Sequence, residues 1–129
     1  MNKTENEIGK IIVNTAFDIH RGLGVGLLEN VYEAVLYERL KAQGLQVERQ
    51  VPVAIEFEEL RFENAFRADL IVENRVIVEL KSVEKINRSH KKQLQTYLKL
   101  TGLKLGFLIN FGEGYFKEAV SRLVNGLEE

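Results

Sequence analysis

The sequence predicts an α/β (α+β) fold in which two helices precede a group of strands, a third helix and a further strand. Apolar residues recur at helical intervals over residues 8–19 and 28–40, and the period then changes to two over residues 51–57. An almost wholly apolar run at residues 105–111 is typical of a strand covered on both faces. The length of 129 residues favours a single domain over residues 1–129.

The two helices at the start of the chain have recognisable ends. The first is expected to begin after Thr4, which has the capping-box spacing to Glu7, and to stop at the glycine-rich loop 22–26. The second is expected from Leu27 to Gln43, before a glycine that ends it. Its predicted apolar face consists of Leu28, Val31, Val35, Leu36 and Leu40.

The next segment is predicted to be made of strands. Val51–Phe57 alternates, and Pro52 places it at an edge or at the beginning of its strand. Residues 66–72 and 76–82 are predicted to form a hairpin around the loop 73–75.

The last third of the chain is predicted to contain a helix and one or two strands. The helix is expected to begin near Ser89, which would cap it, and to end at Gly102; residues 105–111 then form a strand. The tail at residues 115–127 fits either a helix or, over residues 119–124, a short strand.

The composition restricts the chemistry that this chain can perform. It has no cysteine and only two histidines, which excludes a disulfide scaffold, a thiol nucleophile and a zinc site built on cysteine or on many histidines. Any bound metal must therefore be held by oxygen, which favours magnesium, manganese or calcium.

Three charged residues are predicted to converge on one face of the hairpin. With a loop at 73–75, Asp69 lies opposite Glu79, and Glu79 shares its face with Lys81. The other face then carries only the apolar side chains of Ala68, Leu70, Val72, Val76, Val78 and Leu80.

This arrangement suits metal-assisted phosphodiester hydrolysis. Two carboxylates on inner strands are costly unless they pair or coordinate, and they bind a hard divalent cation through oxygen. A neighbouring ammonium group can activate water or stabilise a phosphate in the transition state. The alternative is a cross-strand ion pair between Lys81 and Glu79, with Asp69 solvated at a strand edge.

Two helical segments add polar groups to this picture. Gln93 and Tyr97 lie on one face of the third helix, where both could hydrogen-bond a phosphate, although Tyr97 could instead belong to the core. On the second helix, Glu29 could reach the metal, or it could simply be favoured there by the helix dipole. It belongs to a stripe that continues through Tyr32, Glu33 and Leu36.

The run Gly26-Leu27-Leu28-Glu29-Asn30-Val31-Tyr32 resembles the signature of the GxxExxY protein family, which belongs to the PD-(D/E)xK nuclease superfamily. The resemblance extends over about residues 5–125. It also rests on the run from Ile19 to Gly24, on Asp69 with Glu79-Leu80-Lys81, on Gln93-x-x-x-Tyr97, and on the run from Gly106 to Gly112. It implies a restriction-endonuclease-like core, α-β-β-β-α-β, with an extra N-terminal helix and a strand near residues 119–124.

The resemblance also implies roles for individual residues. Asp69 and Glu79 would hold Mg²⁺ (or Mn²⁺) together with the backbone carbonyl of Leu80, and Lys81 would position or activate the attacking water. Glu29 would complete the metal site. Gln93 and Tyr97 would help to bind nucleic acid, as in the RecB-like branch. The sequence departs from the family pattern at Val25 and Ala68, where prolines are common.

Charge is unevenly distributed along a chain whose net charge is −1. Residues 81–92 carry five cations against one acid, net +4, whereas residues 56–63 carry four acids against one arginine, net −3. The cations that would contact phosphates, besides Lys81, are Lys85, Arg88, Lys91 and Lys92. The alternative is an ordinary solvated face. His20, at a helix end, is expected to be structural, with a contact to Glu29 as the alternative.

These features lead to one functional expectation and one rival. The expectation is a Mg²⁺- or Mn²⁺-dependent nuclease acting on DNA or RNA; the rival is a non-catalytic module that binds nucleic acid or protein. A carboxylate-pair hydrolase acting on sugars leaves Lys81 and the Gln93/Tyr97 pair without a role. No apolar run is long enough to span a membrane, the polar N-terminus has no signal-peptide pattern, and a cytoplasmic protein that could form a homodimer is expected.

Overall fold

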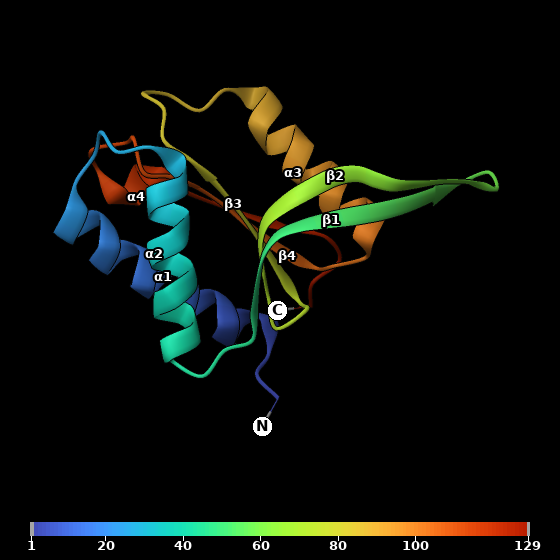
Figure 1. Cartoon of the computed structure of the whole chain (residues 1–129), viewed down its shortest axis with the longest axis horizontal. Helices are drawn as coiled ribbons and strands as arrows, with labels where there is room; N and C mark the ends of the chain where they lie inside the picture. Colours follow the sequence, from blue (N-terminus) through green and yellow to red (C-terminus); the bar gives the residue numbers. More distant parts are fainter. Residues whose placement is uncertain (1, 129) are drawn as a thin grey trace.

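The computed structural model describes residues 2–128 and is built around a five-stranded sheet. The strand order is β1-β2-β3-β4-β5, and all neighbours are antiparallel except the parallel pair β3–β4. The helices are α1 (Glu5–Leu23), α2 (Glu29–Ala42), α3 (Arg88–Thr101) and α4 (Phe116–Ala119); the strands are β1 (Val47–Phe57), β2 (Leu60–Val72), β3 (Val76–Lys81), β4 (Leu105–Asn110) and β5 (Val120–Val124). The predicted α+β class with a mixed sheet is confirmed (Figure 1).

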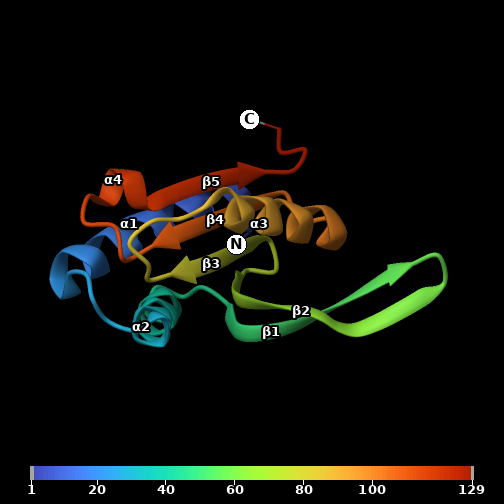
Figure 2. The same cartoon turned by 90° about the horizontal axis from the view of Figure 1, so that it is seen from above.

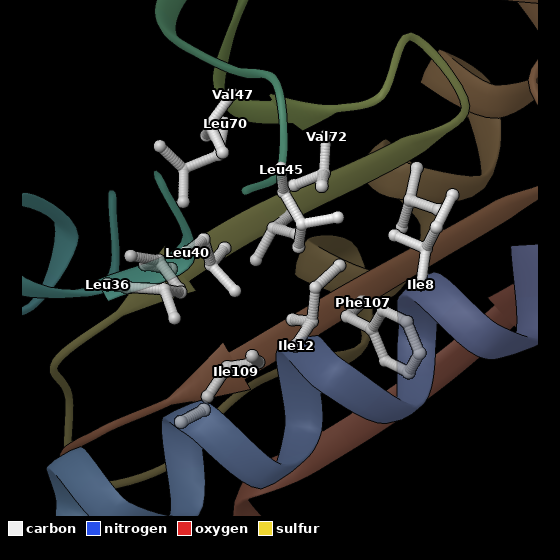
Figure 3. Close-up of a cluster of buried hydrophobic side chains, with 14 of the residues drawn as sticks. Ile8, Ile12, Leu36, Leu40, Leu45, Val47, Leu70, Val72, Phe107 and Ile109 are labelled. Carbon is white, nitrogen blue, oxygen red and sulfur yellow. The ribbon is translucent and has the colours of Figure 1, made fainter. Parts of the chain in front are cut away.

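Helices α1 and α2 cover one face of the sheet and form the larger core with it. Thr4 caps α1 with the predicted capping box to Glu7. Figure 3 shows Ile8 and Ile12 of α1 and Leu36 of α2 directed at the strands. The predicted apolar face of α2 is wrong at its first two positions, because Leu28 and Val31 are exposed. The α2 side chains that are buried are Tyr32, Glu33, Leu36 and Leu40.

Helix α3 covers the opposite face as the crossover between the parallel strands β3 and β4. Its Leu94 and Leu98 pack against Ile77 and Leu108 in a second, smaller core. The predicted cap at Ser89 is wrong: α3 begins at Arg88, and its cap is Asn87, whose side chain accepts a hydrogen bond from the N–H of His90.

Strands β1 and β2 form a hairpin that is longer than the sequence predicts. β1 begins at Val47 rather than Val51, and the two-residue turn Glu58–Glu59 has the positive φ angles of tight hairpin turns. The far end projects beyond the rest of the molecule (Figures 1 and 2). We call residues 55–62 the arm. Its cross-strand pairs, Ile55 with Phe62 and Phe57 with Leu60, lie on one face, and all but Ile55 are mostly exposed.

The β2–β3 hairpin has the predicted register, with Val72 opposite Val76 and Leu70 opposite Val78. The prediction that Ala68 shares the face of Leu70 is wrong. Leu70 packs in the core under α1 and α2, whereas Ala68 packs against α3. The strand therefore changes faces at Asp69, which lies between them.

The tail settles the ambiguity between helix and strand. Only residues Phe116–Ala119 are helical, and Val120–Val124 pairs with β4 as the last strand of the sheet. β4 is buried along its whole length, as predicted. Within residues 2–128, no helix has the length and apolar character needed to cross a bilayer.

Candidate active site

Asp69 and Glu79 lie where β2 and β3 separate. The backbone ladder between these strands ends at the Leu70–Val78 pair. Beyond it, Glu79 Oε2 accepts a hydrogen bond from the Asp69 N–H (2.7 Å), and Asp69 Oδ2 accepts one from the Leu80 N–H (2.8 Å). Each carboxylate replaces a backbone partner of the opposite strand and is thereby held in place.

Burial of this pair alters its acidity. Burial raises the pKa of Asp69, against the opposing effect of the Leu80 N–H, and the charges of Glu33 and Glu29 raise it further. Burial and then the charge of Asp69 raise the pKa of Glu79 to about 8. Two carboxyls in one poorly hydrated site do not ionise together readily, and a nearby cation would relieve that cost.

Lys81 follows Glu79 by two residues on β3 and is half-buried. Its charge lowers the pKa of both Asp69 and Glu79, so the ammonium group lies near both carboxylates. Within residues 2–128, Lys81 Nζ forms no ion pair or hydrogen bond. The alternative of an ion pair between Lys81 and Glu79 is therefore not found in the described part of the chain, and this lysine can interact with a ligand.

The backbone carbonyl of Leu80 faces the β2 side of β3. In an extended strand, the N–H and C=O of one residue lie on the same side. The Leu80 N–H donates to Asp69, whereas the carbonyl of the next residue, Lys81, accepts from Phe111 on the β4 side. The Leu80 oxygen thus lies on the same side of β3 as its N–H, which is bound to Asp69.

Tyr97 of α3 lies against the site, and Gln93 lies one turn earlier on the same helix face. The Tyr97 ring stacks on Phe66 with 3.6 Å between centroids. Burial, then the charges of Glu79 and Asp69, raise the pKa of the Tyr97 hydroxyl, which places it within electrostatic range of both acids. Gln93 is exposed. Tyr97 thus combines the two predicted roles, because its ring packs on an apolar side chain and its hydroxyl lies near the acids.

The two glutamates of α2 differ from one another. Glu29 is exposed, whereas Glu33 is 5% exposed and accepts hydrogen bonds from Arg49 Nε and Gln50 Nε2, both at 2.7 Å. Within residues 2–128, no group of three or more acidic or histidine side chains lies close enough together to hold an ion. Glu29 therefore acts on Asp69 by charge alone in this conformation, and its role as a third ligand stays a prediction.

His20 and Tyr32 have structural contacts. His20 Nε2 lies 2.6 Å from the carbonyl oxygen of Glu113, a residue 93 positions later in the chain. The buried Tyr32 stacks on Phe111 (4.5 Å between centroids), donates its O–H to Gly24 O (2.7 Å) and accepts from the Leu27 N–H (3.2 Å). The tyrosine of the GxxExxY-like run thus fixes the glycine-rich loop.

The predicted phosphate-binding cations are all exposed. Arg88 begins α3, and Lys91 and Lys92 lie in its first turns. Lys85 and Lys91 line a small cavity of about 230 Å³ whose walls also include Glu113 and Glu118. Another cavity, of about 920 Å³, lies between the end of α1 and α4, and His20 is one of the residues that line it. Asp69, Glu79 and Lys81 do not line this cavity.

Comparison with known proteins assigns this arrangement to a family. The family model described as the PD-(D/E)XK nuclease superfamily matches residues 6–123, nearly the whole chain. The chain belongs to the PD-(D/E)XK nuclease superfamily. The predicted restriction-endonuclease-like core with an extra N-terminal helix is thereby confirmed. Searches of curated proteins and of solved structures gave no significant match.

The PD-(D/E)XK assignment agrees with the donor atoms at the site. Nucleases of this superfamily generally depend on divalent metals and act on nucleic acids. Here, all candidate donors are oxygens, and Mg²⁺ typically uses one or two carboxylates and keeps several waters. Asp69, Glu79 and the Leu80 carbonyl match that requirement.

Sequence reasoning missed the polar contacts behind the acid pair. Glu33 is visible in the sequence only as the residue one turn after Glu29. Arg49 and Gln50 precede the alternating segment by which the strand was recognised, and no spacing rule connects them with Asp69. The structure brings Gln50 to both Glu33 and Asp69.

Proposed function

We propose that this chain is a Mg²⁺- or Mn²⁺-dependent nuclease that hydrolyses phosphodiester bonds of DNA or RNA. The observation that supports it best is the Asp69–Glu79 pair. Each carboxylate has one oxygen bound to a backbone N–H of the facing strand, which fixes its orientation. Within residues 2–128, Glu79 Oε1 has no hydrogen bond, and Asp69 Oδ1 has only a long contact of 3.4 Å to Gln50.

The residues around the pair have complementary tasks in this proposal. Asp69, Glu79 and the Leu80 carbonyl hold the cation, which when bound polarises a phosphate oxygen and lowers the pKa of water. Lys81, as a half-buried cation without a protein partner, orients the attacking water and stabilises the charge that develops on the phosphate. Glu29 contributes negative charge from the start of α2.

Helix α3 and the segment before it form the nucleic-acid side of the site. Tyr97 and Gln93 face the substrate next to the acids. The exposed cations Lys85, Arg88, Lys91 and Lys92 contact phosphates without reading sequence. The binding they provide is weak and sensitive to salt, because four to five phosphate contacts release only that many counterions.

The test is a cleavage assay on single- and double-stranded DNA and RNA with Mg²⁺ or Mn²⁺, and with a chelator. The variants are Asp69→Asn and Glu79→Gln, which keep shape and remove charge, with Glu38→Gln, at an exposed position of α2, as the matched control. We expect metal-dependent cleavage that falls by at least about 100-fold in the first two variants and not in the third. Cleavage that survives replacement of both Asp69 and Lys81 by alanine would overturn these roles.

Measurements of metal binding distinguish the nuclease from the rival function, a non-catalytic binding module. The exposed cations by themselves fit either function. A binding module predicts nucleic-acid binding that does not depend on Mn²⁺, together with equal Mn²⁺ titrations of the wild type and Asp69→Asn. A nuclease predicts that Asp69→Asn abolishes the Mn²⁺ heat signal.

Within the superfamily, we assign the chain to the GxxExxY family. The support is that Tyr32 binds the backbone on both sides of Gly26, through Gly24 O and the Leu27 N–H. The spacing from Gly26 to Tyr32 thus allows the tyrosine hydroxyl to bind the backbone of the glycine-rich loop. We also propose that residues 1–129 form one domain.

A homodimer fits the arm. An isolated two-stranded ribbon is only marginally stable in water, and this one exposes Phe57, Leu60 and Phe62 on one face. The arm carries three glutamates against Arg61, a net charge of −2, which disfavours a polyanion as its partner. Sedimentation of the wild type against Phe57→Ser with Phe62→Ser tests this: loss of a dimer supports it, and a wild-type monomer at high concentration refutes it. Arg61→Ser, on the other face, is the control.

A further inference from the structure

Gln50 has a backbone conformation that its place in the strand does not explain. Its φ is +52°, in the left-handed region that side-chain-bearing residues seldom adopt. Within residues 2–128, the other non-glycine residues with positive φ are Glu58, Glu59, Glu73 and Asn74, all in the tight turns of the two hairpins. Gln50 lies inside β1 instead. Strained backbone of this kind persists where the surrounding structure requires it, often beside functional groups.

The conformation interrupts the hairpin opposite Asp69. β1 pairs Arg49 with Leu70 and Val51 with Ala68, so Gln50 faces Asp69 without a paired register between them. Val47 and Leu70 belong to the core under α1 and α2, whereas Val51 and Ala68 pack on the α3 side. Both strands thus change faces at this position, which frees the Gln50 side chain from either core.

The Gln50 amide lies between two carboxylates. Its Nε2 donates to Glu33 Oε1 at 2.7 Å and lies 3.4 Å from Asp69 Oδ1. An amide nitrogen has two hydrogens, so it can serve both acceptors at once. Asp69 Oδ2 is already held by the Leu80 N–H, and the longer contact from Gln50 adds a weak attraction at its second oxygen.

The contacts of Glu33 suit it to bind that amide rather than an ion. It is 5% exposed, and its other oxygen accepts from Arg49 Nε at 2.7 Å. Both carboxylate oxygens therefore have partners, and the acidic charge is compensated by an arginine. The salt bridge with Arg49 holds Glu33 in place, and Glu33 in turn accepts a hydrogen bond from the amide nitrogen of Gln50. That nitrogen lies beside Asp69.

We propose that Gln50 is a positioning residue which, anchored by Glu33 and Arg49, orients the Asp69 carboxylate for the divalent cation. This inference rests on the proposed function, because it assigns Asp69 the role of a metal ligand. Groups that hydrogen-bond a ligating carboxylate from behind typically change metal affinity by about 10- to 100-fold when they are removed.

The decisive variant is Gln50→Gly, because glycine adopts positive φ without strain while the amide is removed with its side chain. We expect calorimetric Mn²⁺ titration to show binding about 10- to 100-fold weaker than in the wild type, in a protein that still unfolds cooperatively in urea. Asn74→Gly is the matched control: it also replaces a residue of positive φ, in the turn between β2 and β3, and should leave the Mn²⁺ affinity unchanged.

Two further variants separate positioning from a merely structural effect. Gln50→Met keeps the length of the side chain and adds no charge but cannot donate a hydrogen bond, so it should weaken Mn²⁺ binding as well. Glu33→Gln should also weaken it, and in the double variant with Gln50→Gly it should add little, since Glu33 acts through Gln50.

The outcomes distinguish this inference from the function on which it rests. Wild-type protein that binds Mn²⁺ through Asp69, combined with undiminished affinity in Gln50→Gly, overturns the role of Gln50 alone. Additive losses in the double variant overturn the assigned link from Glu33 through Gln50. Wild-type protein that does not bind Mn²⁺, or binds it equally after Asp69→Asn, overturns the proposed metal site and this inference with it.

Discussion

Glu79 stands in for a missing strand partner of Asp69: its Oε2 accepts the Asp69 N–H at 2.7 Å where the backbone ladder between β2 and β3 has ended. Asp69 in turn accepts the N–H of Leu80. The two carboxylates thus lie close together where the strands separate. They accept hydrogen bonds from the backbone N–H groups that have lost their partners in the ladder. The pair therefore affects the stability of the sheet as well as the proposed chemistry. Its effect can be measured without a substrate, from the free energy of unfolding.

Stability of the metal-free protein should fall as pH rises from about 5 to 8. The folded state keeps a proton on Glu79, with its pKa of about 8, in a range where the unfolded chain, with the ordinary value of 4.5, has released it. Folded protein thus binds more protons than unfolded protein, so the free energy of unfolding declines, by up to about 1.4 kcal/mol per pH unit for this one group. Urea denaturation with a chelator at several pH values measures it.

The control for that slope is Glu79→Gln, which cannot titrate. The difference in unfolding free energy between wild type and variant should change over this pH range and be nearly constant above it. Addition of Mg²⁺ at pH 8 should stabilise only the wild type. A difference that does not vary between pH 5 and 8 would show that Glu79 has an ordinary pKa.

Replacement of Lys81 should separate chemistry from metal binding. Lys81→Met keeps the aliphatic stem and removes the ammonium group, so we expect cleavage to fall by about 100-fold or more. Mn²⁺ affinity should stay the same or rise, because a positive charge near Asp69 and Glu79 is removed. The exposed Lys99, treated in the same way, should change neither quantity. Parallel losses of cleavage and Mn²⁺ affinity in Lys81→Met would instead indicate a disturbed site.

Loss of the Tyr32 hydroxyl should destabilise the fold. Tyr32→Phe preserves the stacking on Phe111 but leaves Gly24 O and the Leu27 N–H without their partner. We expect a loss of about 1–3 kcal/mol in the free energy of unfolding. Tyr37→Phe, which removes only a long contact from Lys41 (3.4 Å), should be nearly neutral. Equal effects of the two variants would contradict a specific role of Tyr32 in the loop.

The loop after Lys81 depends on a close backbone approach at Gly112. A methyl group there would collide with the backbone nitrogen and oxygen of Val83. Asn110 Oδ1 joins the same two segments by accepting the N–H groups of Val83 and Gly112, both at 3.0 Å. Gly112→Ala should therefore cost about 1–3 kcal/mol of stability and displace the chain that follows Lys81.

Gly114 provides the comparison for that variant. Its Cβ position is open, with no atom within 4 Å, so Gly114→Ala should leave stability nearly unchanged. Thermal unfolding of both proteins is sufficient to measure the contrast. Equal stability of the two alanine variants would show that the segment around Val83 can move aside.

Much of the fold follows from local patterns in the sequence. The capping box at Thr4, the period-two strands and the apolar run of β4 each depend on near neighbours or on uniform burial, and each was confirmed. The loop at 73–75 fixed the register that sets Asp69 opposite Glu79, because a hairpin turn leaves little freedom of pairing. Errors arose at Leu28 and Val31, which are apolar and yet exposed beside the glycine-rich loop.

The sequence by itself determined the element order, the hairpin register and the candidate acids, since these depend on spacing along one chain. Only the tertiary structure decided that both strands change faces at Gln50 and Asp69, and that Glu33 and Arg49 lie behind them. In β1 the change of face coincides with the left-handed conformation of Gln50, which no side-chain pattern encodes for a glutamine. The contacts that restrain Asp69 come from α2 and β1, and their approach depends on the packing of the whole sheet.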